Sequence, residues 1–266
     1  MSDFLKQMGE LSGQRAASAR RSFHESDLDK PVIPMRLNGF DLIAEIKEAS
    51  PSEGALNELQ RSRVELLAGY TQGGAAAISV LTEPTRFGGD IAHLEEVAAQ
   101  SDIPVMRKDF LVDPWQVLEA RAAGASGVLL ITAMLPDSQL DDMLACAFEH
   151  SMFVLLESFD AGDLERTVKL LQSDRNRQQA AQHKLLVGVN TRNLRTLQVD
   201  PGRLASLSSM LPADAVCVAE SGLNESADVE RAASLGYRMA LVGSALMQSA
   251  DPGRLLADML AAGRSS

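Results

Sequence analysis

The chain has 266 residues, a formal net charge of -11 and a hydrophobic content of 45%. This length suits one large α/β domain or two small ones, and the hydrophobic share is sufficient for a sizeable core. The acidic balance argues against nucleic acid or an anionic membrane as the main partner. Any anionic substrate must therefore be attracted by local positive charge.

The N-terminal segment and the cysteines narrow the class of protein further. Leu5, Met8 and Leu11 lie at helical spacing, but no apolar stretch there indicates a secretory signal. No run in the chain approaches the roughly 18 apolar residues that a membrane helix needs. Cys146 and Cys217 belong to no disulfide framework or zinc motif. We expect a cytoplasmic protein with no metal and no cofactor.

Eight short apolar runs, separated by amphipathic stretches, recur along the chain and are typical of βα units. They predict a (β/α)₈ TIM barrel spanning residues 1–266 as a single domain, with residues 1–40 as an N-terminal helical extension. A doubly wound open sheet is the alternative, but no Gly-x-Gly-x-x-Gly follows the first run. The predicted strands are Asp41–Lys47, Ala76–Leu81, Val105–Lys108, Gly127–Ile131, Phe153–Glu157, Leu185–Asn190, Ala215–Glu220 and Met239–Val242.

Polar side chains stand at the carboxyl ends of these predicted strands. Charge in a strand that is buried on both faces is costly, and proteins tolerate it where it carries chemistry. The carboxyl ends of barrel strands also build the active site of such folds. The residues concerned are Glu45 and Lys47 on strand one, Lys108 on strand three, Glu157 on strand five, Asn190 on strand six, and Glu220 with Ser221 on strand seven.

Each of these positions also has a purely structural interpretation, which the sequence leaves open. The alternatives are a buried structural pair for Glu45 with Lys47, a rim ion pair with Asp109 for Lys108, a helix cap for Glu157, and a turn-shaping role for Asn190 and Arg192.

The loops supply candidates for substrate contacts. Gly222 after strand seven, and Gly243 with Ser244 where strand eight leads into a helix, can present backbone N–H groups to a phosphate. The loop Glu48–Gly54 after strand one contains turn formers that suit a lid over the mouth. Phe87, after strand two, could form an apolar wall for an aromatic ring. A plain helix start and a surface loop without function are the respective alternatives.

A set of segments along the chain matches the motifs of one known family: Ala44–Gly54, Ser79–Glu83, Phe87–Gly89, Pro104–Phe110, Gly188–Leu194, Ala219–Gly222 and Leu241–Met247. Through them the chain resembles indole-3-glycerol phosphate synthase from Leu42 to Leu260. The resemblance implies a barrel enzyme, a carbon-carbon lyase (carboxy-lyase) of tryptophan biosynthesis. It would convert 1-(2-carboxyphenylamino)-1-deoxyribulose 5-phosphate to indole-3-glycerol phosphate, carbon dioxide and water.

The resemblance also implies roles for individual residues. Lys108 looks like the general acid that protonates the substrate ketone, and Glu157 like the base for the later dehydration. Lys47 looks like a cation that holds substrate anions and assists as a second acid. Further implied contacts are an orienting network of Glu45, Asn190 and Glu220, a phosphate cradle of Ser221, Gly222, Gly243 and Ser244, and substrate-binding positions at Ser50, Phe87, Phe110 and Arg192.

Two questions stay open from the sequence. Neighbouring, partly desolvated lysines should have lowered pKa values, but nearby glutamates oppose that shift. The function has rivals: a phosphosugar barrel paralogue acting on a modified anthranilate, and a non-catalytic barrel that binds a phosphorylated ligand. A phosphoribosyl-anthranilate isomerase would need a cysteine near the end of strand one, and Ala44–Lys47 has none. We expect a monomer, with a dimer as the alternative, and a small phosphorylated substrate as the partner.

Overall fold

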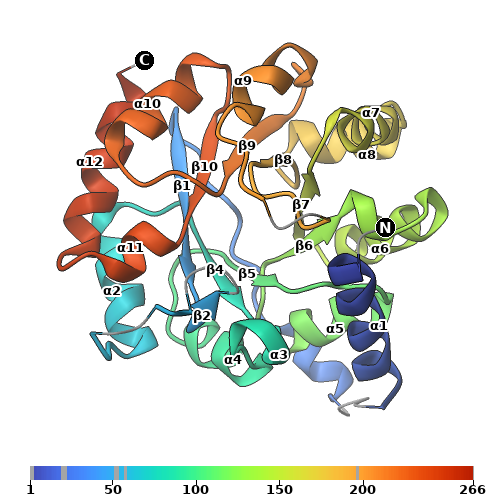
Figure 1. Ribbon diagram of the computed structural model, residues 1–266. Helices are drawn as coiled ribbons and strands as arrows, with labels where there is room; N and C mark the ends of the chain where they lie inside the picture. The colour runs from blue at the N-terminus through green and yellow to red at the C-terminus, as the bar shows by residue number, and fades with distance from the viewer. Residues whose placement is uncertain (1–2, 19–22, 51–53, 57–58, 196–197, 266) are drawn as a thin grey trace.

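The computed structural model describes residues 3–18, 23–50, 54–56, 59–195 and 198–265. Eight parallel strands close into a barrel in the order β1-β10-β9-β8-β7-β6-β5-β4, and helices surround it (Figure 1). The predicted (β/α)₈ barrel is confirmed. The strands are β1 (Asp41–Ile46), β4 (Ala77–Leu81), β5 (Val105–Lys108), β6 (Gly127–Ile131), β7 (Phe153–Ser158), β8 (Leu185–Asn190), β9 (Val216–Glu220) and β10 (Met239–Val242).

Along the chain, one or more helices follow each barrel strand, and a small antiparallel hairpin comes directly after β1. The hairpin consists of β2 (Ala49–Ser50) and β3 (Gly54–Ala55). The helices are α2 (Arg63–Gly73), α3 (Pro84–Phe87), α4 (Ile91–Ala98), α5 (Pro114–Ala122), η2 (Thr132–Met134), α6 (Asp137–Glu149), α7 (Ala161–Leu170), α8 (Asp174–Ala181), α9 (Arg203–Leu207), η3 (Ser208–Met210), α10 (Ser226–Ser234), α11 (Ser244–Gln248) and α12 (Pro252–Arg264).

Short-range sequence signals set where several helices begin and end. The side chains of Ser62, Asp90 and Asp113 each accept a hydrogen bond from a backbone N–H in the first turn of the helix that follows. These caps satisfy donors that have no partner inside the helix. Gly74 ends α2 in the left-handed conformation, with φ of 94°, so that the chain can turn into β4.

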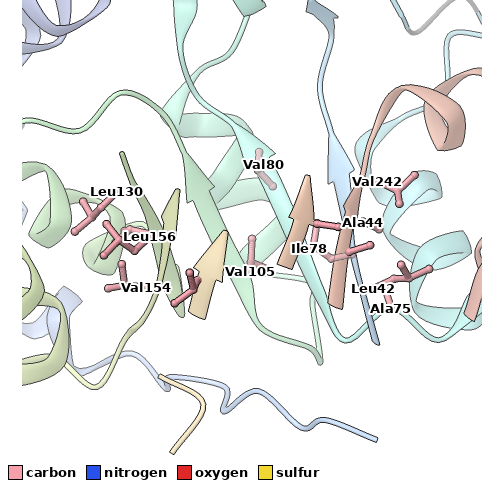
Figure 2. Packing of buried hydrophobic residues seen from close by; sticks show 14 of the residues in the cluster. Leu42, Ala44, Ala75, Ile78, Val80, Val105, Leu130, Val154, Leu156 and Val242 are labelled. Carbon is pink, nitrogen blue, oxygen red and sulfur yellow. The ribbon is translucent and has the colours of Figure 1, made fainter. Parts of the chain in front are cut away.

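Side chains that point alternately to the two faces of each strand form two separate apolar layers. In β1, Leu42 and Ala44 belong to a cluster between the strands and the helices, part of which Figure 2 shows, whereas Ile43 belongs to the cluster inside the barrel. Successive residues of a strand point to opposite faces. Glu45 therefore shares the inner face with Ile43, and Lys108 shares it with Met106. The strand periodicity that packs the barrel thus also turns the charged end residues inward.

The N-terminal segment forms α1 (Asp3–Ser18) and a short 3₁₀ turn, η1 (Glu25–Asp29). Leu5 and Met8 of α1 are buried in the cluster inside the barrel, and Leu11 packs against it. The predicted helical stripe is therefore the face by which α1 covers the barrel. Among the described residues, no helix has both the length and the apolar character needed to cross a membrane.

Candidate active site at the carboxyl ends of the strands

A cavity of about 370 Å³ opens at the carboxyl ends of the strands, and every barrel strand contributes to its lining. Fourteen residues are predicted for the site, and thirteen of them line this cavity. The exception is Ser50, which lies in β2 but whose side chain, like residues 51–53 of the predicted lid, lies outside the described part of the chain. The lining residues are Glu45, Lys47, Phe87, Lys108, Phe110, Glu157, Asn190, Arg192, Glu220, Ser221, Gly222, Gly243 and Ser244.

Lys108 lies between two buried carboxylates. Its Nζ is 3.4 Å from Oε2 of Glu157 and 3.6 Å from Oε2 of Glu220. Asn190 donates a hydrogen bond of 3.1 Å from Nδ2 to the same Oε2 of Glu157. Glu157 is thus oriented by a cation and an amide at the end of β7. The helix cap that was the alternative for Glu157 is supplied by Asp160 instead.

The charged run at the end of β5 makes two separate sets of contacts. Lys108 points into the cavity, whereas its neighbours Arg107 and Asp109 pair with each other at 3.1 Å, and Arg107 also pairs with Glu119 of α5. Asp109 also accepts a hydrogen bond of 2.6 Å from Arg15 of α1. The alternative rim pair between Lys108 and Asp109 is therefore wrong. Asp109 instead fastens the N-terminal helix next to the end of β5.

Glu45 and Lys47 form a second ion pair at the mouth, with Nζ 2.8 Å from Oε1. Gly243, at the end of β10, makes room for this pair. A Cβ atom at position 243 would lie 2.5 Å from Oε1 of Glu45 and 3.0 Å from Nζ of Lys47. Glu45 is buried and Lys47 partly so, with side-chain exposures of 4% and 13%, and both border the cavity. Lys47 can therefore meet an anion there without leaving its carboxylate.

Two opposing effects, burial and neighbouring charge, act on the pKa of Lys108. Burial lowers the pKa of Lys108, but the charges of Glu157, Glu220 and Glu45 outweigh burial and raise the pKa above its ordinary value. The sequence left open whether burial or the nearby glutamates decide the pKa of this lysine, and the structure favours the glutamates. Lys108 is consequently an ammonium ion across the neutral range.

The same crowding keeps Lys108 charged but favours the neutral form of Glu220. Burial raises its pKa well above the ordinary value, and the charge of Glu157 adds to that effect, while Lys108 opposes it. Two carboxylates that share one cation in a buried site do not both ionise readily. Glu220 therefore keeps its proton to a higher pH than an exposed glutamate does.

The side of the cavity near β9 and β10 carries the predicted anion contacts. Ser221 and Gly222 both have left-handed backbone conformations, with φ of 64° and 70°. The helix after Gly243 is α11, which has only five residues. Any anion site here therefore depends on the two turns, because a helix this short adds little dipole. Arg192 also borders the cavity, and its backbone N–H donates to Oδ1 of Asn190 at 2.9 Å.

The opposite wall is apolar and aromatic. Phe110 has Phe87 and Phe4 as neighbours, each with a ring-centroid distance of 6.1 Å. Leu129 and Ile131 of β6 complete this wall. Phe4 of α1 is part of this wall but was not among the residues predicted from the sequence. Its position beside the apolar stripe of that helix was the only local signal, and it does not reveal which side of the barrel the helix covers.

Comparisons with known proteins agree with this geometry. A family model described as indole-3-glycerol phosphate synthase matches residues 5–259. Proteins named indole-3-glycerol phosphate synthase are similar to the chain. The one from Micrococcus luteus is 45% identical over 214 residues, covering 80% of this chain and 75% of the relative. The one from Nocardioides sp. is 45% identical over 230 residues, covering 85% and 84%. "Indole-3-glycerol phosphate synthase 1" from Streptomyces coelicolor is 40% identical over 250 residues, covering 94% and 86%.

Solved structures add support for the fold. The crystal structure of 3-hexulose-6-phosphate synthase from Salmonella typhimurium superposes with a TM-score of 0.63. It has 17% sequence identity and covers 84% of this chain and 97% of that one. At this identity the likeness concerns the barrel alone.

Proposed function

The chain belongs to the indole-3-glycerol phosphate synthase family, which makes it a carboxy-lyase of tryptophan biosynthesis, and we propose that Lys108 and Glu157 carry its chemistry. The observation behind this proposal is the placement of the Lys108 ammonium group. It is held by Glu157 and Glu220 in a cavity with an aromatic wall on one side and two anion-accepting turns on the other. Membership of the family also removes the non-catalytic barrel from consideration.

The two walls fit the two ends of the substrate. The carboxyphenylamino ring can lie against Phe110 and Phe87, and the phosphate against the turns at Gly222 and Gly243. Between them the ketone reaches Lys108. A substrate held in this way has its reacting carbons close together, which removes much of the entropic barrier to ring closure.

Proton transfers then follow the positions of the groups. Lys108 donates a proton to the ketone oxygen while the ring carbon that bears the carboxylate forms a bond to the ketone carbon. Loss of carbon dioxide restores the aromatic ring. The new hydroxyl group leaves as water, and Glu157 removes the proton whose loss forms the indole double bond. Lys47, held by Glu45, neutralises substrate anions and assists the departure of the hydroxyl group.

The remaining predicted residues have supporting roles in this proposal. Asn190 and Glu220 orient Glu157 and Lys108, and Arg192 adds positive charge at the rim. Ser221 and Ser244 join the two glycines in binding phosphate, and Ser50 contacts the substrate from the hairpin after β1. We further propose that the enzyme works in the cytoplasm as a monomer, since one chain supplies every described wall of the cavity.

The test is replacement of Lys108 by alanine. A positioned acid contributes roughly 10²–10⁴-fold to the rate, so Lys108→Ala should lower kcat by about that factor. Indole fluorescence follows the product, and circular dichroism verifies the fold. Lys169→Ala is the matched control, because Lys169 is exposed on α7 and is not among the residues that line the cavity. A Lys108→Ala enzyme with the kcat of the wild type would remove Lys108 from the mechanism.

A further inference from the structure

The turn after β9 holds a conformation that its sequence does not favour. Ser221 has φ of 64°, and Gly222 follows with φ of 70°. The left-handed region is open to glycine, but for a serine it is costly because Cβ approaches the following carbonyl oxygen. Conformations of this kind persist where surrounding contacts impose them. Some neighbour must therefore hold this turn in place.

That neighbour is Thr191, the residue after β8. Its backbone N–H donates to the carbonyl oxygen of Glu220 at 2.9 Å, and its Oγ1 donates to the carbonyl oxygen of Ser221 at 3.1 Å. Thr191 is itself fixed, because its own carbonyl oxygen accepts hydrogen bonds from Asp200 N at 2.9 Å and from Arg203 Nη1 at 2.6 Å. The threonine is 3% exposed and is not part of the cavity lining, unlike Ser221 and Gly222.

The direction of the Ser221 carbonyl determines the direction of the next N–H. In a trans peptide the C=O of one residue and the N–H of the following residue lie in one plane and point in opposite directions. The Ser221 carbonyl points to Thr191, behind the cavity wall. The N–H of Gly222 therefore points away from Thr191, and Gly222 itself lines the cavity. A rotated peptide would instead present a carbonyl oxygen to an approaching anion.

We propose that Thr191 is a positioning residue that locks the peptide between Ser221 and Gly222, so that the Gly222 N–H binds a phosphate oxygen of the substrate. This inference rests on the proposed function, which places the phosphate at this turn. The lock does not touch Lys108 or Glu157. Its loss should weaken the binding of phosphate groups and leave the chemical step largely intact.

The experiment compares Thr191→Val, which keeps the branched shape but lacks the hydroxyl, with Thr191→Ser, which keeps the hydroxyl. One intramolecular hydrogen bond corresponds to roughly a 3- to 10-fold effect, so Thr191→Val should weaken inorganic phosphate binding and raise KM by about that factor, with kcat within about twofold. Calorimetric titration measures phosphate binding, and Thr191→Ser should resemble the wild type. Equal phosphate affinity of Thr191→Val and wild type, or an equal loss in Thr191→Ser, would overturn the inference.

A measurement on the unaltered protein guards against a valine variant that does not fold. In a ¹⁵N-labelled sample, the Gly222 amide resonance should move on addition of inorganic phosphate, with the affinity found by calorimetry. A Gly222 resonance that does not move while phosphate binds elsewhere would refute the proposed role of Thr191. Failure of the wild type to form the indole product would count against the proposed function. If the wild type forms no product but its Gly222 resonance still responds to phosphate, the proposed role of Thr191 is supported all the same.

Discussion

Gly188, in the middle of β8, offers a test of how tightly the cage around Lys108 is built. A Cβ atom at this position would lie 2.1 Å from Oε1 of Glu220 and 3.2 Å from Cδ1 of Leu155. Ordinary van der Waals contact begins at 3.4 Å. The carboxylate of Glu220 would therefore have to withdraw by 1.3 Å (3.4 − 2.1) in Gly188→Ala.

The expected fall in kcat follows from the contact between Glu220 and Lys108. Its Oε2 is 3.6 Å from Nζ of Lys108, so withdrawal of the carboxylate moves or frees the ammonium group. A misplacement of about 1 Å at a reacting group can lower the rate about 10²-fold, and we expect a fall of this order in kcat. Overpacking of this kind costs about 1–3 kcal/mol of stability, which a typical domain survives.

A double-mutant cycle separates the clash from a general disturbance. Product formation is followed by indole fluorescence in Gly188→Ala, in Glu220→Ala and in the double variant. Without the Glu220 carboxylate the added methyl group has space, so Gly188→Ala should cost little further activity in that background. Gly162→Ala is the control, because its Cβ would meet its nearest neighbour, Oδ1 of Asp160, at 3.5 Å.

Two results would refute this reasoning. If Gly188→Ala keeps the kcat of the wild type, the position of the Glu220 carboxylate does not matter for Lys108. If the two substitutions reduce kcat by factors that simply multiply, the added methyl group acts by another route than Glu220.

Two further predictions concern the carboxylates themselves. Because the pKa of Glu220 is raised in the folded state, its contribution to stability is present below the ordinary value of 4.5 and is lost as pH rises through the folded pKa. In Glu220→Gln the free energy of unfolding should fall less steeply with pH, by up to about 1.4 kcal/mol per pH unit. Chemical denaturation between about pH 4.5 and 8 measures this slope, and an unchanged slope would contradict the prediction. Glu157→Gln should release carbon dioxide faster than it forms the indole double bond in a single turnover, since the proposed base acts only in dehydration. Equal slowing of both events would argue against that role.

The positions of the strands and of the polar residues at their ends could be predicted from the sequence. β1 begins at Asp41 as expected and ends at Ile46, one residue earlier than expected. Strand periodicity is a local property, so the alternation that buries Ile43 also places Glu45 on the inner face. Closure of eight parallel strands then brings their carboxyl ends to one mouth. For this reason the catalytic candidates were found together where the fold predicts an active site.

The charge state of the site and the make-up of its aromatic wall depend on distances between segments that are far apart in the sequence. The pKa of Lys108 depends on how closely Glu157 and Glu220 approach it, and this separation is a product of barrel closure. The aromatic wall gains Phe4 only because α1 packs over the mouth, where Arg15 binds Asp109. Local patterns determine which face of a strand or helix a side chain occupies. The packing of distant segments determines which charges meet, and so sets the chemistry of the site.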